Sequence, residues 1–212
     1  MRARYTVGMR APTPADHYRG YDDLSGRYLE GVDYAVHVVQ PLRTGVAVIA
    51  PHGGGIEGGT SEAARLIAAA DHGLYLFEGL RKSGDNFDCL HLTSRYFDEP
   101  RCLSLIAECD TVVAVHGYAA HGPDVLLGGR DERMKAELER GLAAHGLSCQ
   151  ANGHRYPGTD PLNVCNRGRS GQGVQLELSS TLRRSREYAA LARAVRDVLG
   201  SMIIPMPTMA GA

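Results

Sequence analysis

The sequence predicts an α/β protein with an open, mixed and mostly parallel central sheet flanked by helices. Short continuous apolar runs, such as Gly45 to Ala50 and Thr111 to Val115, are typical of strands that are buried on both faces. These runs alternate with amphipathic helical segments, which is the order of elements in sheets covered by helices. The chain has 212 residues, 43% of them hydrophobic and 22% charged, which is enough for one large domain with a filled core.

The organisation of the chain indicates one unit. It contains no internal repeat, no low-complexity tract and no linker long enough to divide it. We therefore expect a single domain over residues 1–212. Its parts are a polar segment, 1–44, a core of alternating strands and helices, 45–184, and a C-terminal helix with a proline-rich tail, 185–212.

The expected strands begin after a polar N-terminal stretch. Tyr34 to Val39 alternates loosely between polar and apolar residues and fits an edge strand. The buried run Gly45 to Ala50 is expected to end at Pro51, before a glycine-rich loop from His52 to Gly59. The remaining strands are expected at Leu74 to Glu78, Cys89 to Thr93, Thr111 to Val115, Val125 to Leu127, Leu147 to Ala151 and Val174 to Ser179.

The expected helices carry end signals. Thr60 or Ser61 can cap a helix that has Glu62 in its first turn, and Gly73 is expected to close it. Further helices are expected from Pro100 through Glu108, from Asp131 to Ala144 and from Ser185 to Leu199.

The charge balance limits the class of partner. The chain has 23 Lys and Arg residues against 24 Asp and Glu residues, a net charge of −1. Such a surface does not attract nucleic acid or anionic lipid as a whole, so any anion binding is local. We expect no nucleic acid and no membrane among the partners, and for the oligomeric state, which the sequence leaves open, we favour a monomer.

The sequence also predicts the compartment. Residues 1–16 lack the apolar core of a secretory signal, and the most apolar run, Met202 to Met206, is far shorter than the ~20 residues of a membrane-spanning helix. The five cysteines are widely spaced and include no CxxC pair. We therefore expect free thiols in a reducing cytoplasm.

Polar side chains follow two of the buried strands. In α/β sheets the ligand site lies outside the carboxyl ends of the strands, and His52 and His116 are expected at such ends. Glu57 lies five positions after His52, in a loop whose glycines allow a sharp reversal. Two imidazoles and a carboxylate are the ligand set of a catalytic zinc site, so we expect Zn²⁺ at this place.

Each of these residues has a simpler interpretation when taken alone. A histidine at a strand end is more often a hydrogen-bonded structural residue. A glycine loop before a helix can also bind phosphate, although this loop lacks the Walker Lys-Ser/Thr ending and the GxGxxG spacing. For His121, in a glycine-rich stretch, we favour a loop residue with no metal role over a ligand or substrate contact.

Glu177 and two arginines add further chemistry. Glu177 shares one face of its strand with Gln175 and Ser179, which fits a half-exposed strand or a carboxylate that takes a proton from water beside the metal. Arg167 and Arg169 lie among small residues, which fits capture of carboxylate groups or simple solvation of loop charges.

Several motifs follow one another in order between positions 45 and 184. Two are long enough to be specific, Pro51-His-Gly-Gly-Gly-Ile-Glu57 and Gln175-Leu-Glu-Leu-Ser179. On these motifs the chain resembles the poly-γ-glutamate hydrolase family of bacilli and their phages. The basic run Arg183 to Arg186 and residues 1–44 lie outside the strongest resemblance. The shorter matching motifs are Gly59-Thr-Ser61, Leu92-Thr-Ser94, Phe97-Asp-Glu-Pro100, His116-Gly117, Gly128-Gly129 with Asp131, Asp160-Pro-Leu-Asn163 and Asn166-Arg167.

The resemblance implies a fold similar to that of zinc carboxypeptidases. It also implies one Zn²⁺ held by His52, Glu57 and His116, with Glu177 as the catalytic carboxylate, acting first as general base and then as general acid. Members of the family cut γ-glutamyl amide bonds in a capsule polymer that carries one α-carboxylate per residue, so the expected partner is a small or polyanionic γ-glutamyl substrate. The residues expected to bind it are Arg167, Arg169, Arg95 and Asn166.

Two other functions fit the same residues. One is a related zinc amidohydrolase that acts on N-acyl amino acids or on γ-glutamyl bonds of peptidoglycan. The other is a catalytically silent, zinc-containing protein with a binding or replication-associated role. An open coordination position favours an enzyme, and four protein ligands favour the silent protein.

Overall fold

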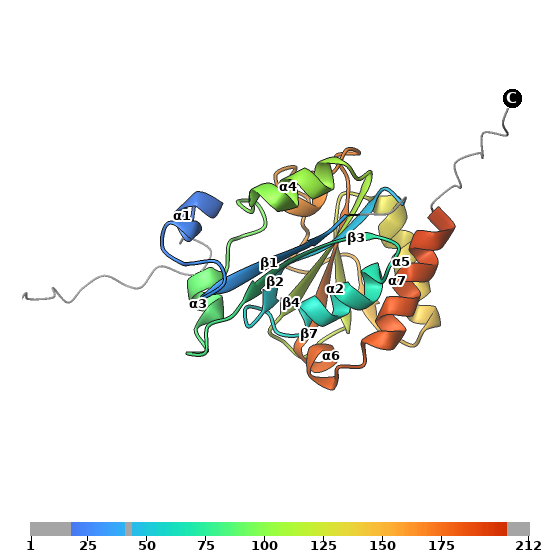
Figure 1. Ribbon diagram of the computed structural model, residues 1–212. Helices are drawn as coiled ribbons and strands as arrows, with labels where there is room; N and C mark the ends of the chain where they lie inside the picture. Colours follow the sequence, from blue (N-terminus) through green and yellow to red (C-terminus); the bar gives the residue numbers. More distant parts are fainter. Residues whose placement is uncertain (1–17, 41–43, 203–212) are drawn as a thin grey trace, which may run out of the picture.

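The computed structural model describes residues 18–40 and 44–202, which are built around a seven-stranded sheet (Figure 1). Four neighbouring strand pairs are parallel and two are antiparallel, so the predicted mixed, mostly parallel α/β sheet is confirmed. The strands, in their order across the sheet, are β1 (Tyr34–Val39), β3 (Gly73–Gly79), β2 (Val46–Gly54), β4 (Thr111–Tyr118), β7 (Val174–Ser179), β5 (Val125–Gly129) and β6 (Cys149–Gln150).

Helices cover both faces of this sheet. On one face α2, α5 and α7 pack against alternate strand residues such as Val48, Leu76 and Val113. On the other face α1 and α4 pack against the intervening residues, such as Ile49 and Tyr75 (Figure 1). The helices are α1 (Tyr21–Ser25), α2 (Thr60–Ala68), α3 (Asn86–Leu90), α4 (Pro100–Ala107), α5 (Glu132–Ala144), α6 (Ser180–Ser185) and α7 (Tyr188–Met202), with a 3-10 turn, η2 (Val164–Asn166).

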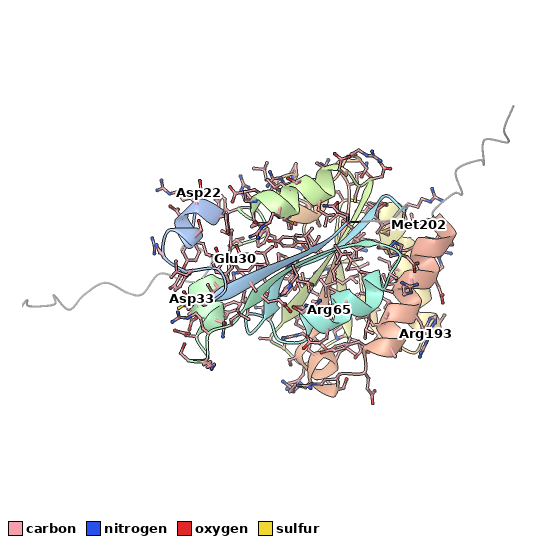
Figure 2. The ribbon with its side chains drawn as sticks, viewed as in Figure 1. Asp22, Glu30, Asp33, Arg65, Arg193 and Met202 are labelled. Atoms are coloured by element: carbon pink, nitrogen blue, oxygen red, sulfur yellow. The ribbon has the colours of Figure 1, made fainter. Side chains whose placement is uncertain are left out.

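Charged side chains lie on the outer sides of the helices. Figure 2 shows side chains filling the space between the sheet and the helices, while Asp22, Arg65 and Arg193 lie on the exposed sides of α1, α2 and α7. Within residues 18–40 and 44–202, no helix is both long enough and apolar enough to cross a membrane. The predictions for the N-terminal residues 1–17 and for the tail at 203–212 lie outside the described residues.

The strand β2 does not end at Pro51, as the sequence predicted, but continues to Gly54. Pro51 is tolerated because β2 pairs with β4 only from Val46 to Ile49 and shifts its register against β3 between Ala50 and Gly53. Position 51 is therefore outside the regular pairing of β2 with either neighbour, and the N–H group that proline lacks is not needed there. The extension places His52 inside the strand.

The ends of α2 also differ from the prediction. Gly59, with a φ of +99°, precedes the helix, and neither Thr60 nor Ser61 caps it. Instead the Thr60 hydroxyl donates to the carbonyl of His52 or of Glu57, at 3.2 Å and 2.9 Å. The helix ends at Ala68, before Gly73, which opens β3.

The predicted strand at Cys89 to Thr93 is wrong. The chain forms the short helix α3 and then a loop. Leu90 and Leu92 are both buried, and they contact the core on either side of the end of α3. Two other predictions change in extent. The strand predicted at Leu147 to Ala151 is shorter and comprises only Cys149–Gln150. The last helix starts at Tyr188 and not at Ser185, because Ser185 ends α6 and a turn with Arg186 at φ 58° separates the two helices.

Candidate metal centre

Three predicted site residues lie towards the carboxyl ends of adjacent strands. His52 belongs to β2, His116 to β4 and Glu177 to β7. His116 and Glu177 are directly paired in the parallel register of β4 and β7, so their side chains point to the same face of the sheet. All three are nearly inaccessible to solvent, with exposed fractions of 2%, 2% and 6%. The sheet therefore brings these groups together in a buried place.

Glu57 reaches the same place from the tight loop between β2 and α2. Its N–H donates to the carbonyl of His52 at 2.9 Å, which folds the loop back onto the strand. Its Oε2 accepts the N–H of Gly117 at 2.8 Å. Backbone groups of β2 and β4 thus fix the carboxylate between the two strand ends.

A backbone carbonyl sets the tautomer of His52. Its Nε2 donates to the carbonyl of Leu92 at 2.8 Å, because that oxygen can only accept. In the neutral ring the Nδ1 then carries a lone pair, and it faces Glu57 and His116. This is the way a metal-binding histidine is commonly oriented by a second partner.

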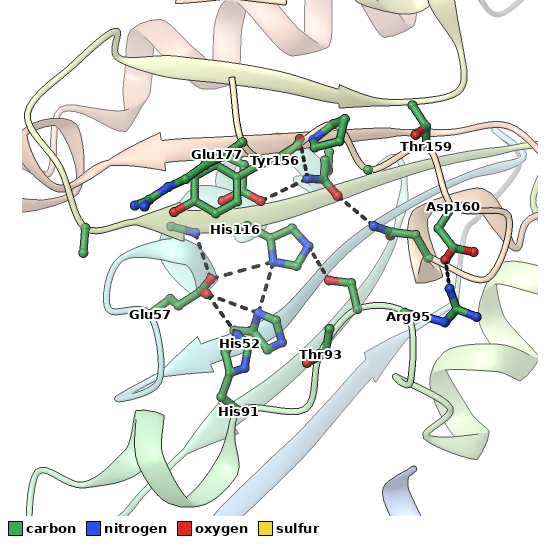
Figure 3. Close-up of a pocket in the computed structure, with 18 of the residues that line it drawn as sticks. His52, Glu57, His91, Thr93, Arg95, His116, Tyr156, Thr159, Asp160 and Glu177 are labelled. Atoms are coloured by element: carbon green, nitrogen blue, oxygen red, sulfur yellow. Dashed lines mark hydrogen bonds and ion pairs between the residues drawn. The ribbon is translucent and has the colours of Figure 1, made fainter. Parts of the chain in front are cut away.

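The donor atoms of these residues are close enough to share one ion. His52 Nδ1 lies 3.1 Å from His116 Nδ1 and 3.3 Å from Glu57 Oε1, and Glu57 Oε2 lies 3.8 Å from His116 Nδ1 (Figure 3). Ligands at the usual zinc distances in a tetrahedral site are separated by roughly 3.4 Å. The separations of His52, Glu57 and His116 are therefore close to those of ligands that share one ion.

His91, which the sequence analysis did not select, also belongs to this cluster. Its Nε2 lies 3.6 Å from Glu57 Oε1, its ring stacks on that of His52 with centroids 4.0 Å apart, and the ligand atoms of His52, Glu57 and His91 lie within 4.8 Å of one another. Its buried Nδ1 has no hydrogen-bond partner among the described residues. The available signal was its position directly before the Leu92-Thr-Ser94 motif, but the predicted strand obscured it.

Burial and the mutual charges set the pKa values in the cluster. Burial lowers the pKa of His52 to about 4, and the charge of His91 acts in the same direction. Burial alone would raise the pKa of Glu57, but the three histidines around it hold this pKa well below its usual value. The pKa of His116 is raised, because Glu57 and Glu177 outweigh the effect of burial. A neutral His52 beside a charged Glu57 is the state that binds a cation.

Glu177 is held in a chain of buried amides. Gln175 donates from its Nε2 to Glu177 Oε1 at 3.0 Å, and Asn163 donates to Gln175 Oε1 at 3.0 Å. Burial raises the pKa of Glu177 to about 7, although His116 opposes this. The alternative of a half-exposed strand does not hold, because all six residues of β7 are buried. Glu177 is thus a buried carboxyl whose Oε1 is held by Gln175 and whose pKa lies near neutral pH.

A pocket of about 550 Å³ opens over the cluster. The residues that line it include His52, Glu57, His116 and Glu177, together with His91 and Tyr156 (Figure 3). Ser94 also lines it. Two cationic side chains line it as well. They are Arg95, which pairs with Asp160, and Arg155, which lies 5.1 Å from the centre of the Tyr156 ring. The cluster is therefore accessible to a ligand despite its burial.

The structure does not bring the other predicted substrate residues to this pocket. Arg169 pairs with Asp110, next to the amino end of β4, which is the opposite end from His116. Arg167 donates to the carbonyl of Phe97. Asn166 uses its side chain to bond four backbone groups, those of Arg130, Gly158, Asp160 and Gly173. His121 is exposed and bonded to Thr181.

The fold and the cluster together define an α/β protein that gathers imidazoles and carboxylates at one edge of its sheet, a donor set used by zinc hydrolases. The family model of poly-gamma-glutamate hydrolase matches residues 18–193. The chain therefore belongs to the poly-gamma-glutamate hydrolase family, and the resemblance seen in the sequence motifs is confirmed.

Curated relatives and solved structures agree with this membership. In Bacillus subtilis (strain 168), YndL is 37% identical and the SPbeta prophage-derived protein YoqZ is 42% identical, each over 172 residues and 80% of this chain. The chain spans 66% of the length of YndL and 61% of the length of YoqZ.

Two solved structures share the whole architecture. A bacteriophage poly-gamma-glutamate hydrolase superposes with a TM-score of 0.81 at 30% identity, over 88% of this chain and 98% of that one. YndL in a zinc-free apo form superposes with a TM-score of 0.81 at 31% identity, over 89% of this chain and 100% of that one.

Proposed function

We propose that the protein is a zinc-dependent hydrolase that cuts γ-glutamyl amide bonds in poly-γ-glutamate. The observation that carries the proposal is the convergence of the His52 and His116 Nδ1 atoms, 3.1 Å apart, on the two carboxylate oxygens of Glu57, at 3.3 and 3.8 Å, beside the buried carboxyl of Glu177. Family membership supports the class of reaction and the polymer. The existence of a zinc-free form of YndL supports zinc as the metal.

His52, His116 and Glu57 would hold the metal through Nδ1, Nδ1 and the carboxylate. We assign the third position to His116 and not to His91, because the Nδ1 atoms of His116 and His52 already lie 3.1 Å apart. Zn²⁺ at this place supplies a Lewis acid that polarises a carbonyl group and acidifies water. Three protein ligands would leave a coordination position for water or substrate, as in catalytic zinc sites.

Glu177 would move the proton. Its Oε1 is occupied by the Gln175 amide, so Oε2 is the oxygen available to take a proton from the attacking water. The same oxygen would then deliver the proton to the leaving amine. Burial raises the pKa of Glu177 to about 7 when no cation is bound. A bound Zn²⁺ would lower this pKa, which favours a carboxylate that is ready to accept the proton.

The cations that line the pocket would bind the substrate carboxylates. Arg95 remains from the sequence prediction, but Asp160 neutralises it. Arg155 is exposed, lines the pocket and forms no ion pair with any described residue. We therefore assign the main carboxylate contact to Arg155, with its guanidinium held over the ring of Tyr156.

Replacing Arg155 with glutamine is expected to raise KM for poly-γ-glutamate about tenfold or more while kcat changes little. The variant loses the charge-assisted contact between the guanidinium group and a substrate carboxylate, and this contact is equally strong in the bound substrate and in the transition state. The measurement is steady-state cleavage of the polymer. Arg133→Gln, an exposed arginine outside the pocket, is the matched control and should behave as the wild type. An unchanged KM in the Arg155 variant would remove this residue from substrate binding.

The proposed function is tested by removing and restoring the metal. Chelation is expected to stop polymer cleavage, and addition of Zn²⁺ should restore it and raise Tm, since zinc binds only the folded protein. Small N-acylglutamates and γ-glutamyl peptides of peptidoglycan are assayed in parallel. Cleavage that survives exhaustive chelation contradicts metal dependence, and activity on the small substrates alone contradicts the polymer as substrate.

We further infer a monomeric cytoplasmic protein without nucleic acid or membrane partners. All five cysteines are free, and Cys102, Cys109 and Cys165 are buried, which is in keeping with a reducing compartment. Gel filtration with light scattering tests the monomer.

A further inference from the structure

Arg183 contacts the backbone of three separate segments that carry site residues. It lies on α6, which follows β7 directly. Its Nη1 donates to the carbonyl of Gly58 at 2.9 Å, its Nη2 to that of Tyr118 at 3.2 Å and its Nε to that of Leu178 at 3.2 Å. One guanidinium group therefore joins the loop after β2, the end of β4 and the end of β7.

Each of these carbonyls lies next to a site residue in the chain. Gly58 directly follows Glu57, and Leu178 directly follows Glu177. Tyr118 lies two residues after His116. The side chain of Arg183 does not line the pocket itself. It acts on the site through these three backbone contacts and through its charge, which lowers the pKa of Glu177 against the effect of burial.

Two glycines of the site motifs leave the space that Arg183 occupies. A Cβ on Gly117 would lie only 2.5 Å from the Nε of Arg183. A Cβ on Gly59 would lie 2.2 Å from the hydroxyl of Tyr188, and that hydroxyl donates to the carbonyl of Arg183 at 2.7 Å. The positions of Gly59 and Gly117 are thus fitted to Arg183 and to the group that supports it.

We propose that Arg183 is a positioning residue that sets the placement of Glu57, His116 and Glu177 relative to one another. The inference rests on the proposed zinc site. Arginine suits this task because its planar group offers donors in a fixed fork, which here reach three carbonyls in different directions. Lysine keeps the charge but has a single ammonium group on a flexible stem, so it cannot hold the three segments in the same geometry.

The test compares wild type, Arg183→Lys and Arg184→Lys. Arg184 lies next to Arg183 on α6, is exposed and provides the matched control. Zinc affinity is measured by competition with a chromogenic chelator, and the visible absorption of the Co²⁺-substituted protein reports the coordination geometry, which spectroscopically silent Zn²⁺ does not show. Arg183→Lys is expected to bind zinc about 10- to 100-fold more weakly, the usual cost of losing an outer contact of a metal site, and to alter the cobalt spectrum. Arg184→Lys should match the wild type in both.

Thermal unfolding of the zinc-free proteins separates positioning from general stability. A variant that is folded at the assay temperature and binds zinc more weakly supports the role of Arg183. If Arg183→Lys has the zinc affinity and the cobalt spectrum of the wild type, the positioning role of Arg183 is overturned. If the zinc-free variant is unfolded, the positioning role is overturned as well, because Arg183 would then support the whole fold. If the wild type binds no zinc, the proposed function fails instead.

Discussion

Replacing Glu177 with glutamine is expected to leave the protein folded and zinc-loaded but nearly inactive. Glutamine has the same shape and can still accept the hydrogen bond from Gln175, and it places no charge in a buried position. It cannot accept a proton from water, so kcat should fall by about 10² to 10⁴-fold. Polymer cleavage and zinc content by elemental analysis are measured on the same samples.

The matched control for this variant is Glu187→Gln. Glu187 is exposed and lies outside the pocket, so its change should leave both kcat and zinc content as in the wild type. Full activity of the Glu177 variant would show that another group moves the proton. Loss of zinc from it would place Glu177 among the ligands.

Alanine at His52 or at His116 is expected to remove the metal. Wild type should contain about one zinc per chain, as a site with three protein ligands predicts, and each variant should lose it on dialysis. His91→Ala should keep its zinc, because we place His91 beside the three ligands and not among them. Elemental analysis of the dialysed proteins measures the zinc content per chain of the wild type and of each variant.

His121→Ala, an exposed histidine bonded to Thr181, is the control for these variants. Thermal unfolding of the zinc-free proteins shows whether each one still folds, since His52 also bonds the carbonyl of Leu92. A folded His116 variant with full zinc content, together with a His91 variant without zinc, would make His91 the third ligand.

The parts of the site that could be predicted from the sequence are those fixed by the sheet. Buried apolar runs identify central strands, and residues at the carboxyl ends of neighbouring parallel strands must lie near one another. This is why His52 and His116 were selected together, and they do converge in the structure. Glu177, selected for the polar face of its strand, is paired directly with His116. Their roles as ligands and as base stay predictions until the variants are measured.

Residues on loops could not be placed in the same way. Arg167 and Arg169 were predicted to bind substrate carboxylates because small residues surround them in the sequence. That pattern does not show at which end of the sheet the loop lies. Arg169 in fact pairs with Asp110, 59 positions away in the sequence. Arg155, which does line the pocket, lies in a segment without regular structure and gave no periodic signal. No role for Arg183 could be predicted, because its three partners are backbone carbonyls, which leave no trace in the sequence.

The position of β7 has a consequence for how the molecule is made. It is the last strand along the chain, yet it lies between β4 and β5 in the sheet. During synthesis β4 and β5 cannot pair with β7 until Val174–Ser179 has left the ribosome. Each of the two strands keeps an unpaired edge until then. Pairs among the earlier strands, such as β2 with β3, can form early. The pairing of β7 with β4 and β5 joins segments that are far apart in the chain, and such pairing is intrinsically slow. Since Glu177 lies on the same strand, a truncated or half-folded chain would lack the proposed proton acceptor, and we expect the proposed hydrolase activity to report completion of the sheet.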